Sequence, residues 1–226
     1  ITFHRYPGDR DRNNVVFCGP GDIKKKKKML MEMIDYANNK HKRSGDSKLR
    51  WGLTEFNVTT SNPDREISGI GNTSFLGGQF IAEIYGIGME YGAFTMNPWC
   101  ISETDKLKTD FGFLGAPSDF LPRSSYYHTQ MMAMNMKGSF LPTSSTNSYV
   151  HSIAARSEDE ICIMILNRDK YNDYDFDLIL NKEKFSRKSL TVRADLGLDT
   201  MISGTIPNQI TLMYVLSKSG EIKKQY

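Results

Sequence analysis

Apolar segments of two different periods alternate through residues 1–138. Strand-like runs lie at residues 1–7, 49–58 and 93–102. Each is followed by a segment whose apolar residues recur at helical spacing, at residues 23–42, 75–92 and 125–137. Asp22 is expected to cap the first of these helices. Because alternating strands and helices form parallel sheets covered by helices, this pattern predicts an α/β unit.

The pattern changes after residue 142. Short β-rich segments with polar turns between them lie at residues 148–157, 160–169, 174–181, 189–196 and 210–220. Close spacing of short strands is typical of an antiparallel β-sandwich. We therefore predict two domains, an α/β domain over residues 1–142 and a small β-sandwich over residues 143–226.

Composition excludes several classes of function. The net charge is +3, and the lysine run 24–28 supplies much of the positive charge without interleaved aromatic residues. This indicates a solvated helix face, so no nucleic-acid partner is expected. No apolar run is long enough for a membrane span. The chain begins inside a strand-like run, so we expect further protein before it.

The three cysteines, Cys18, Cys100 and Cys162, are far apart and form no CxxC or Cys/His cluster. This spacing argues against a zinc site and leaves room for one disulfide. No metal and no organic cofactor is expected.

Polar and aromatic residues gather near the ends of the three predicted parallel strands. They are His4, Tyr6, Glu55, Asn57, Asn97 and Trp99. In parallel βα architectures the chemistry lies at the carboxyl ends of the strands. A sugar site needs an aromatic platform, hydrogen-bonding side chains and a carboxylate at the anomeric carbon, and this set supplies all three. The structural alternative is a strand-end salt bridge for Glu55 and satisfied core groups for the others. Glu103 is expected to cap or solvate its loop.

Three short motifs resemble the large retaining clan of glycoside hydrolases called clan A. Thr54-Glu55-Phe56 is similar to the "TEW", "TEY" or "TEF" context of the nucleophile that ends strand seven in that clan. "ITFHRYP" resembles the end of strand six, where a His or Tyr hydrogen-bonds the nucleophile, and Trp99 in "MNPWC" resembles the strand-eight Trp that lines a sugar subsite. The xylosidase/iduronidase and related families also carry a β-sandwich. The resemblance therefore implies the C-terminal part of a (β/α)8 TIM barrel, strands six to eight, followed by a small antiparallel β-sandwich.

The resemblance also implies a retaining mechanism. Glu55 would be the nucleophile, and His4 or Tyr6 would orient it. The clan's acid/base is a Glu that usually follows Asn at the end of strand four, and this chain contains no Asn-Glu pair. The acid/base is thus expected outside this chain, in an N-terminal remainder of the barrel that belongs to the same parent or to another chain. The two carboxyl groups would lie about 5–5.5 Å apart.

Two other functions stay open at this point. A non-catalytic carbohydrate-binding protein could keep the same architecture, although a Glu at position 55 favours the enzyme. An unrelated α/β enzyme with a phosphate-bearing ligand would need a glycine-rich loop directly after a strand, and none is found. The expected substrate is a polysaccharide or oligosaccharide of unspecified sugar. A secreted or periplasmic location would follow if the protein degrades polysaccharide.

Overall fold

The computed structural model describes residues 1–9, 15–60, 66–103, 110–118, 120–180, 191–194 and 200–226. Contacts divide the chain into two compact units, Ile1–His128 and Thr129–Tyr226. This division falls before residue 142, and the domain boundary at 142/143 stays a prediction. The first unit mixes helices and strands, whereas the second consists mainly of strands.

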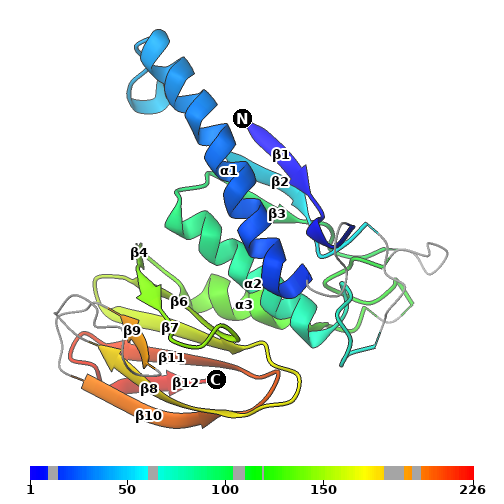
Figure 1. Ribbon diagram of the computed structural model, residues 1–226, viewed down its shortest axis with the longest axis vertical. Coiled ribbons are helices and arrows are strands. Elements are labelled where there is room, and N and C mark those ends of the chain that lie inside the picture. The colour runs from blue at the N-terminus through cyan, green and yellow to red at the C-terminus, as the bar shows by residue number, and fades with distance from the viewer. Residues whose placement is uncertain (10–14, 61–65, 104–109, 119, 181–190, 195–199) are drawn as a thin grey trace. The chain divides into compact units, whose positions relative to one another are not determined.

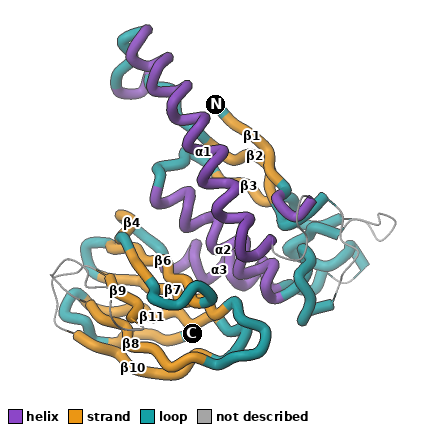
Figure 2. The backbone as a smooth tube through the Cα atoms, in the orientation of Figure 1, coloured by secondary structure: helices purple, strands orange, loops and turns teal. Residues whose placement is uncertain are grey.

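The first unit is built on a parallel sheet. Its described strands are β1 (Thr2–Arg5), β2 (Gly52–Phe56) and β3 (Met96–Pro98), in the spatial order β1-β2-β3. β2 runs parallel to both neighbours. The helices between them are α1 (Val15–Lys40) and α2 (Phe75–Glu90), which lie side by side (Figures 1 and 2). Two short 3-10 helices cover Pro7–Asp9 and Gly45–Ser47. The predicted alternation of strands and helices is confirmed.

The start of α1 differs from the prediction. The helix begins at Val15, and Asp22 is an internal residue whose carboxylate pairs with the guanidinium of Arg5 instead of capping the helix. Gly19 in the added part of the helix lies close to Phe80, because a Cβ there would lie 2.9 Å from the ring. The helix is therefore about two turns longer at its start than the local pattern indicates, and Pro20 lies inside it.

The core of the first unit lies between the sheet and its helices. β2 and the residues around it supply the centre of this core, and α1 and α2 supply the cover. Its buried members are Ile23, Ile34, Trp51, Leu53, Phe56, Val58, Leu76, Phe80, Ile81, Ile84 and Ile87. Burial of a side chain of this size contributes roughly 1.5–3 kcal/mol. The core therefore fixes the strands whose carboxyl ends carry the predicted site.

A third helix, α3 (Ser124–Asn135), begins in the first unit and ends in the second. Its first turn packs on α2: the Ser124 hydroxyl donates to the carbonyl of Phe75 at 3.1 Å, and the ring of buried His128 meets that of Phe75 edge-on. Because His128 is buried away from water, its pKa is lowered to about 4.

The second unit is a β-sandwich. Its strands are β4 (Ser139–Leu141), β5 (Thr143–Ser144), β6 (Val150–Arg156), β7 (Glu160–Asn167), β8 (Tyr174–Leu180), β9 (Thr191–Ala194), β10 (Thr200–Ile206), β11 (Thr211–Ser217) and β12 (Ile222–Gln225). The described strands form one sheet in the order β10-β8-β9-β5 and another in the order β12-β11-β7-β6-β4. All pairs are antiparallel except β8 with β9, which run parallel. The sequence pattern did not predict β4, β5, β10 or β12.

Both sheets contribute to the sandwich core. Its members alternate along each strand, as Ile161, Ile163 and Ile165 do on β7 and Phe176 and Leu178 do on β8. The other face of β7 is buried as well. Burial on both faces explains why β7 has a continuous apolar sequence rather than an alternating one.

None of the three cysteines, all of them described, forms a disulfide. No helix in the described ranges is both long and apolar enough to cross a membrane. Within those same ranges, no group of three or more His, Cys, Asp or Glu side chains comes together as a metal site.

Candidate active site

The register of the parallel sheet changes at the carboxyl end of β2. Phe3 of β1 pairs with Leu53, but the next residue, His4, pairs with Glu55, so Thr54 is an extra residue in β2. The pairing of β2 with β3 shifts over the same stretch. An extra residue in one strand re-aims the side chains around it. This irregularity places Glu55 opposite His4.

The carboxylate of Glu55 lies between two side chains of the first strand. The Tyr6 hydroxyl donates a hydrogen bond of 2.6 Å to Oε1, and His4 Nδ1 lies 3.5 Å from Oε2. The Glu55 side chain is 27% exposed, so water and a ligand can reach it, whereas His4 is 59% exposed. The structure therefore brings His4, Tyr6 and Glu55 together, with Tyr6 as the closer partner.

The environment of Tyr6 keeps its hydroxyl protonated. Burial raises the pKa of the Tyr6 phenol far above its ordinary value, and the hydrogen bond to Glu55 and the nearby negative charges raise it further. The ring centroid of Tyr6 lies 5.9 Å from that of Phe111, with the rings tilted by 58°. This contact fixes the ring, so Tyr6 is a permanent donor held in one orientation toward Glu55.

Trp99 follows β3 and remains accessible. Its backbone N–H donates to the carbonyl of Phe56 at 2.8 Å, which places it beside the end of β2. The side chain is 45% exposed, and its indole N–H donates to Oε1 of Glu103 at 3.3 Å. The peptide bond between Trp99 and Cys100 is cis. An indole with an exposed face and a fixed N–H offers the apolar surface on which a sugar ring can stack.

Asn57 lies behind the site and not at its surface. The residue is 2% exposed, and its amide nitrogen donates to the carbonyls of Trp99 and of Phe111 at 2.5 and 3.2 Å. Its side-chain oxygen accepts the N–H of Val58 at 2.8 Å. The side chain thus ties together the two segments that carry Trp99 and Phe111.

Asn97 is not brought into this group. Its side chain is exposed and accepts a hydrogen bond of 2.7 Å from the hydroxyl of Thr95, two residues earlier. No hydrogen bond joins it to Glu55, Tyr6 or Trp99 in the described structure. A role for Asn97 in the site stays a prediction.

Sequence reasoning missed the segment around Phe111. The guanidinium of Arg123 makes a bidentate pair with Asp110, with one contact at 2.7 Å, and also donates to the carbonyl of Gly112 at 3.2 Å. The N–H of Phe111 donates to Oε2 of Glu103 at 3.3 Å. Glu103 therefore binds both Trp99 and Phe111. Residues 110–113 show no hydrophobic periodicity that would predict a strand or helix. The only sequence signal for this segment was that Asp110 and Arg123, 13 residues apart, could form an ion pair.

Chemically, the site offers one accessible carboxylate with a fixed hydroxyl donor and a nearby aromatic face. Cys100 lies close to this group, and burial, together with the charge of Glu103, raises the pKa of its thiol to about 11. The thiol is therefore protonated at neutral pH and is a poor nucleophile.

Comparisons with known proteins agree on the fold. No protein-family model matches the sequence, and no curated protein matches it significantly. The α-L-arabinofuranosidase of Thermotoga maritima matches in structure over 96% of this chain, with a TM-score of 0.67 and 12% sequence identity. This chain spans 52% of that protein, which is about half of its length.

Other solved structures match over less of the chain. A family 30 subfamily 8 xylanase of Clostridium acetobutylicum matches 74% of this chain and 42% of its own, with a TM-score of 0.48 and 12% identity. A family 44 xyloglucanase of Paenibacillus polymyxa matches 76% and 32%, with a TM-score of 0.44 and 12% identity. At 12% identity these likenesses concern the fold alone. The predicted fold class, part of a TIM barrel plus a β domain, is confirmed by the arabinofuranosidase match.

Proposed function

We propose that this chain is part of a retaining glycoside hydrolase in which Glu55 is the nucleophile. The observation that carries the proposal is the 2.6 Å hydrogen bond from the Tyr6 hydroxyl to Glu55, made at the carboxyl ends of two adjacent parallel strands. This is the edge of the sheet where barrel enzymes of this architecture place their chemistry. The accessible indole of Trp99 supports a sugar ligand.

In the proposed reaction, a Glu55 oxygen attacks the anomeric carbon of the sugar. A C–O bond to Glu55 forms while the bond to the leaving oxygen breaks, and a carboxylic acid outside this chain gives its proton to that oxygen. The same group then takes a proton from water, whose oxygen attacks the anomeric carbon and releases Glu55. Tyr6 holds the carboxylate in line, and Trp99 supports the sugar ring.

The proposal includes a partner for the first unit. A TIM barrel closes with eight parallel strands, whereas the described sheet of this unit has three. We propose that this chain supplies the C-terminal strands and that the remainder of the barrel, from the same parent or from another chain, supplies the others and the acid/base. The domain division at residues 142/143 belongs to this proposal.

Rescue by an external nucleophile tests the role of Glu55. In the parent protein or complex that contains this chain, Glu55→Ala should abolish hydrolysis of an activated aryl glycoside, because no covalent intermediate can form. Azide is small enough to enter the space and attack the anomeric carbon from the same side. Azide should therefore restore release of the aryl group and give a glycosyl azide of inverted configuration.

Two outcomes would count against the proposal. Full activity of Glu55→Ala would remove Glu55 from the mechanism. Loss of activity without azide rescue, in a variant whose unfolding temperature is unchanged, would assign Glu55 a supporting role. Glu103→Ala serves as the matched control, because it removes a nearby carboxylate that the mechanism does not use as nucleophile, and azide should have no effect on it.

A non-catalytic carbohydrate-binding role is the alternative, and the 45% exposure of Trp99 favours it as much as it favours the enzyme. In that case the native protein would bind sugar without hydrolysing it. Trp99→Ala would abolish this binding, whereas Glu55→Gln would bind sugar as the native protein does and would also show no hydrolysis. The enzyme is the correct alternative if the parent protein hydrolyses sugar and Glu55→Gln loses this hydrolysis while it still binds sugar.

A further inference from the structure

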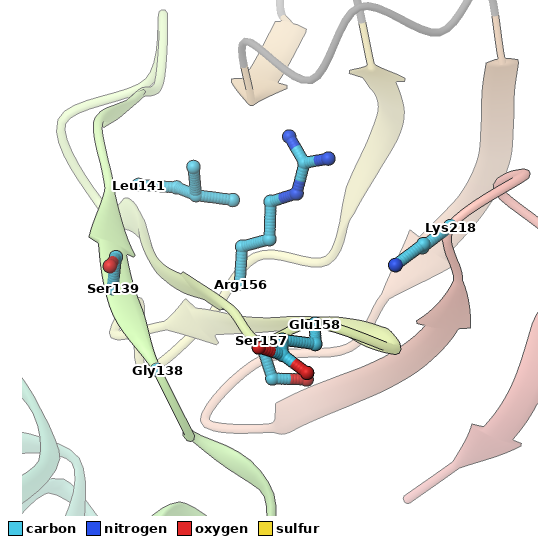
Figure 3. Close-up of a pocket in the computed structure, with 7 residues that line it drawn as sticks. All are labelled: Gly138, Ser139, Leu141, Arg156, Ser157, Glu158 and Lys218. Carbon is cyan, nitrogen blue, oxygen red and sulfur yellow. The ribbon is translucent and has the colours of Figure 1, made fainter.

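The β-sandwich carries a hollow that the proposed mechanism does not use. Its volume is about 440 Å³, and all of its lining residues belong to the second unit. The lining consists of Gly138, Ser139, Leu141, Arg156, Ser157, Glu158 and Lys218, as Figure 3 shows. Two cations, one carboxylate, two hydroxyls and one aliphatic side chain therefore surround it.

The register of the strands explains how the two cations reach the hollow. On β6, Val150 and Ala154 point into the sandwich core, and Arg156 is the next position of the same parity. On β11, Tyr214 and Leu216 point into the core, and Lys218 follows with the same parity. Side chains alternate between faces with period two. Arg156 thus continues the inward-facing row of β6 at its exposed end, and Lys218 directly follows the end of β11.

These rows end at the same end of the five-stranded sheet. Arg156 of β6 and Leu216 of β11 both pair with Ile161 of β7, which lies between the two strands. Ser139 of β4 pairs with Arg156 on its other side. Aliphatic residues at positions 156 and 218 would extend the apolar core, whereas this chain places two positive charges there.

Neither cation is neutralised by a residue that the structure describes. The side chains of Arg156, Lys218 and Glu158 form no hydrogen bond or ion pair with any residue of the described structure. Lys223, by contrast, pairs with Glu160 at 3.3 Å nearby. An anionic ligand would gain from both positive charges, and Glu158 at the border would oppose it.

We propose that this hollow is a second, non-catalytic site that binds an acidic sugar unit by its carboxylate. The guanidinium of Arg156 suits the two oxygens of a carboxylate, and Lys218 adds a second charge. Ser139 and Leu141 offer a hydroxyl and methyl groups for the polar edge and the C–H face of a sugar ring. The volume of about 440 Å³ is large enough to hold a sugar residue. The sugar part of this inference rests on the proposed function, whereas the carboxylate part rests on the two cations alone.

Calorimetric titration with trigalacturonate tests the site, with xylotriose as a neutral trisaccharide and acetate as a free carboxylate. At low ionic strength trigalacturonate should bind, and the two other probes should not. Arg156→Gln and Lys218→Gln should each weaken binding by at least about tenfold, because each removes a charge-assisted contact. Glu158→Gln should strengthen binding, because it removes a repelling charge.

Lys170→Gln is the matched control. Lys170 is exposed just beyond the other end of β7, so this variant removes the same charge from the same unit without touching the hollow. No binding of trigalacturonate, or an equal loss in Lys170→Gln, would overturn the proposal. Acetate binding as tightly as trigalacturonate would overturn the sugar assignment.

Hydrolysis is scored separately in the parent protein or complex. Arg156→Gln should leave cleavage of an activated aryl glycoside unchanged. The proposed function is contradicted only by the results of the Glu55 variants. The two proposals can therefore fail independently. A loss of cleavage in Arg156→Gln with an unchanged unfolding temperature would contradict the non-catalytic assignment.

Discussion

Tyr6 and Glu55 lie 49 residues apart in the sequence, and the Tyr6 hydroxyl donates a 2.6 Å hydrogen bond to the Glu55 carboxylate. The bond joins the ends of β1 and β2, where the extra residue Thr54 changes the register. It is supported from behind by Phe111, which packs on Tyr6. The arrangement holds a carboxylate in one orientation while leaving it accessible.

Replacing Tyr6 by Phe tests this relationship. The variant keeps the ring that packs on Phe111 and removes only the hydroxyl, so the fold should be retained. We expect kcat for an aryl glycoside to fall about 10- to 100-fold in the parent protein or complex, the value of one hydrogen bond to a charged group. KM should change little. An unchanged kcat would show that Tyr6 does not orient Glu55.

The contact between Glu103 and Trp99 predicts a separate effect on sugar binding. Glu103→Ala removes the acceptor of the indole N–H, so Trp99 should become more mobile and KM should rise several-fold with a smaller change in kcat. Glu103→Gln keeps an acceptor oxygen and should restore most of the binding. Tryptophan fluorescence anisotropy in a Trp51→Phe background reports on Trp99 directly. If the anisotropy of Trp99 is the same with Ala, Gln or the native Glu at position 103, Glu103 does not position Trp99.

Buried His128 predicts a pH dependence of stability. Because its pKa in the folded protein, about 4, lies below the ordinary 6.5, the unfolded chain binds a proton that the folded chain does not. The contribution of neutral His128 to the free energy of unfolding is therefore fully present above pH 6.5 and declines as the pH falls toward 4. It amounts to about 3 kcal/mol. Urea unfolding between pH 4 and 7 measures this slope. His128→Gln should remove this part of the slope, and an unchanged slope would contradict the assignment.

The packing of α2 against α3 predicts that a side chain at Gly78 destabilises the protein, whereas a side chain at Gly21 on α1 does not. A Cβ at Gly78 would lie 2.7 Å from a backbone atom of Ser124 and from His128 Nδ1, so Gly78→Ala should lower the free energy of unfolding by at least about 2 kcal/mol. Gly21→Ala on α1 is the control, because nothing lies within 4 Å of its Cβ position. That variant should be neutral or stabilising by up to about 1 kcal/mol. Equal effects on the unfolding temperature would contradict the packing.

The sequence predicted the fold class and the central pair of the site for physical reasons that can be stated. Hydrophobic periodicity defined the strands that end near Tyr6 and Glu55, and parallel pairing brought those ends together. Phe111 was missed because its segment is held by the Arg123–Asp110 pair and not by a periodic pattern. Asn57 was expected among the site residues, and the structure buries its amide, which donates to the carbonyl of Trp99.

The errors in the elements have a similar origin. β10 includes Gly204 and several hydroxyl residues, so its apolar content is low, and only pairing with β8 defines it as a strand. Asp22 was predicted to cap α1, whereas its carboxylate pairs with Arg5 of β1 and the helix begins earlier. In both cases a tertiary contact decides the structure, and local sequence carries little of that information.

The central claim is that Glu55 forms a covalent bond with the sugar. The direct measurement is mass spectrometry of the parent protein or complex after reaction with a panel of 2-deoxy-2-fluoro glycosyl fluorides, which slow release of the glycosyl-enzyme. The account predicts a single glycosyl adduct on the peptide that contains Glu55, and its loss in Glu55→Gln. An adduct on a different carboxylate, or hydrolysis of aryl glycosides that survives in Glu55→Gln, would contradict it.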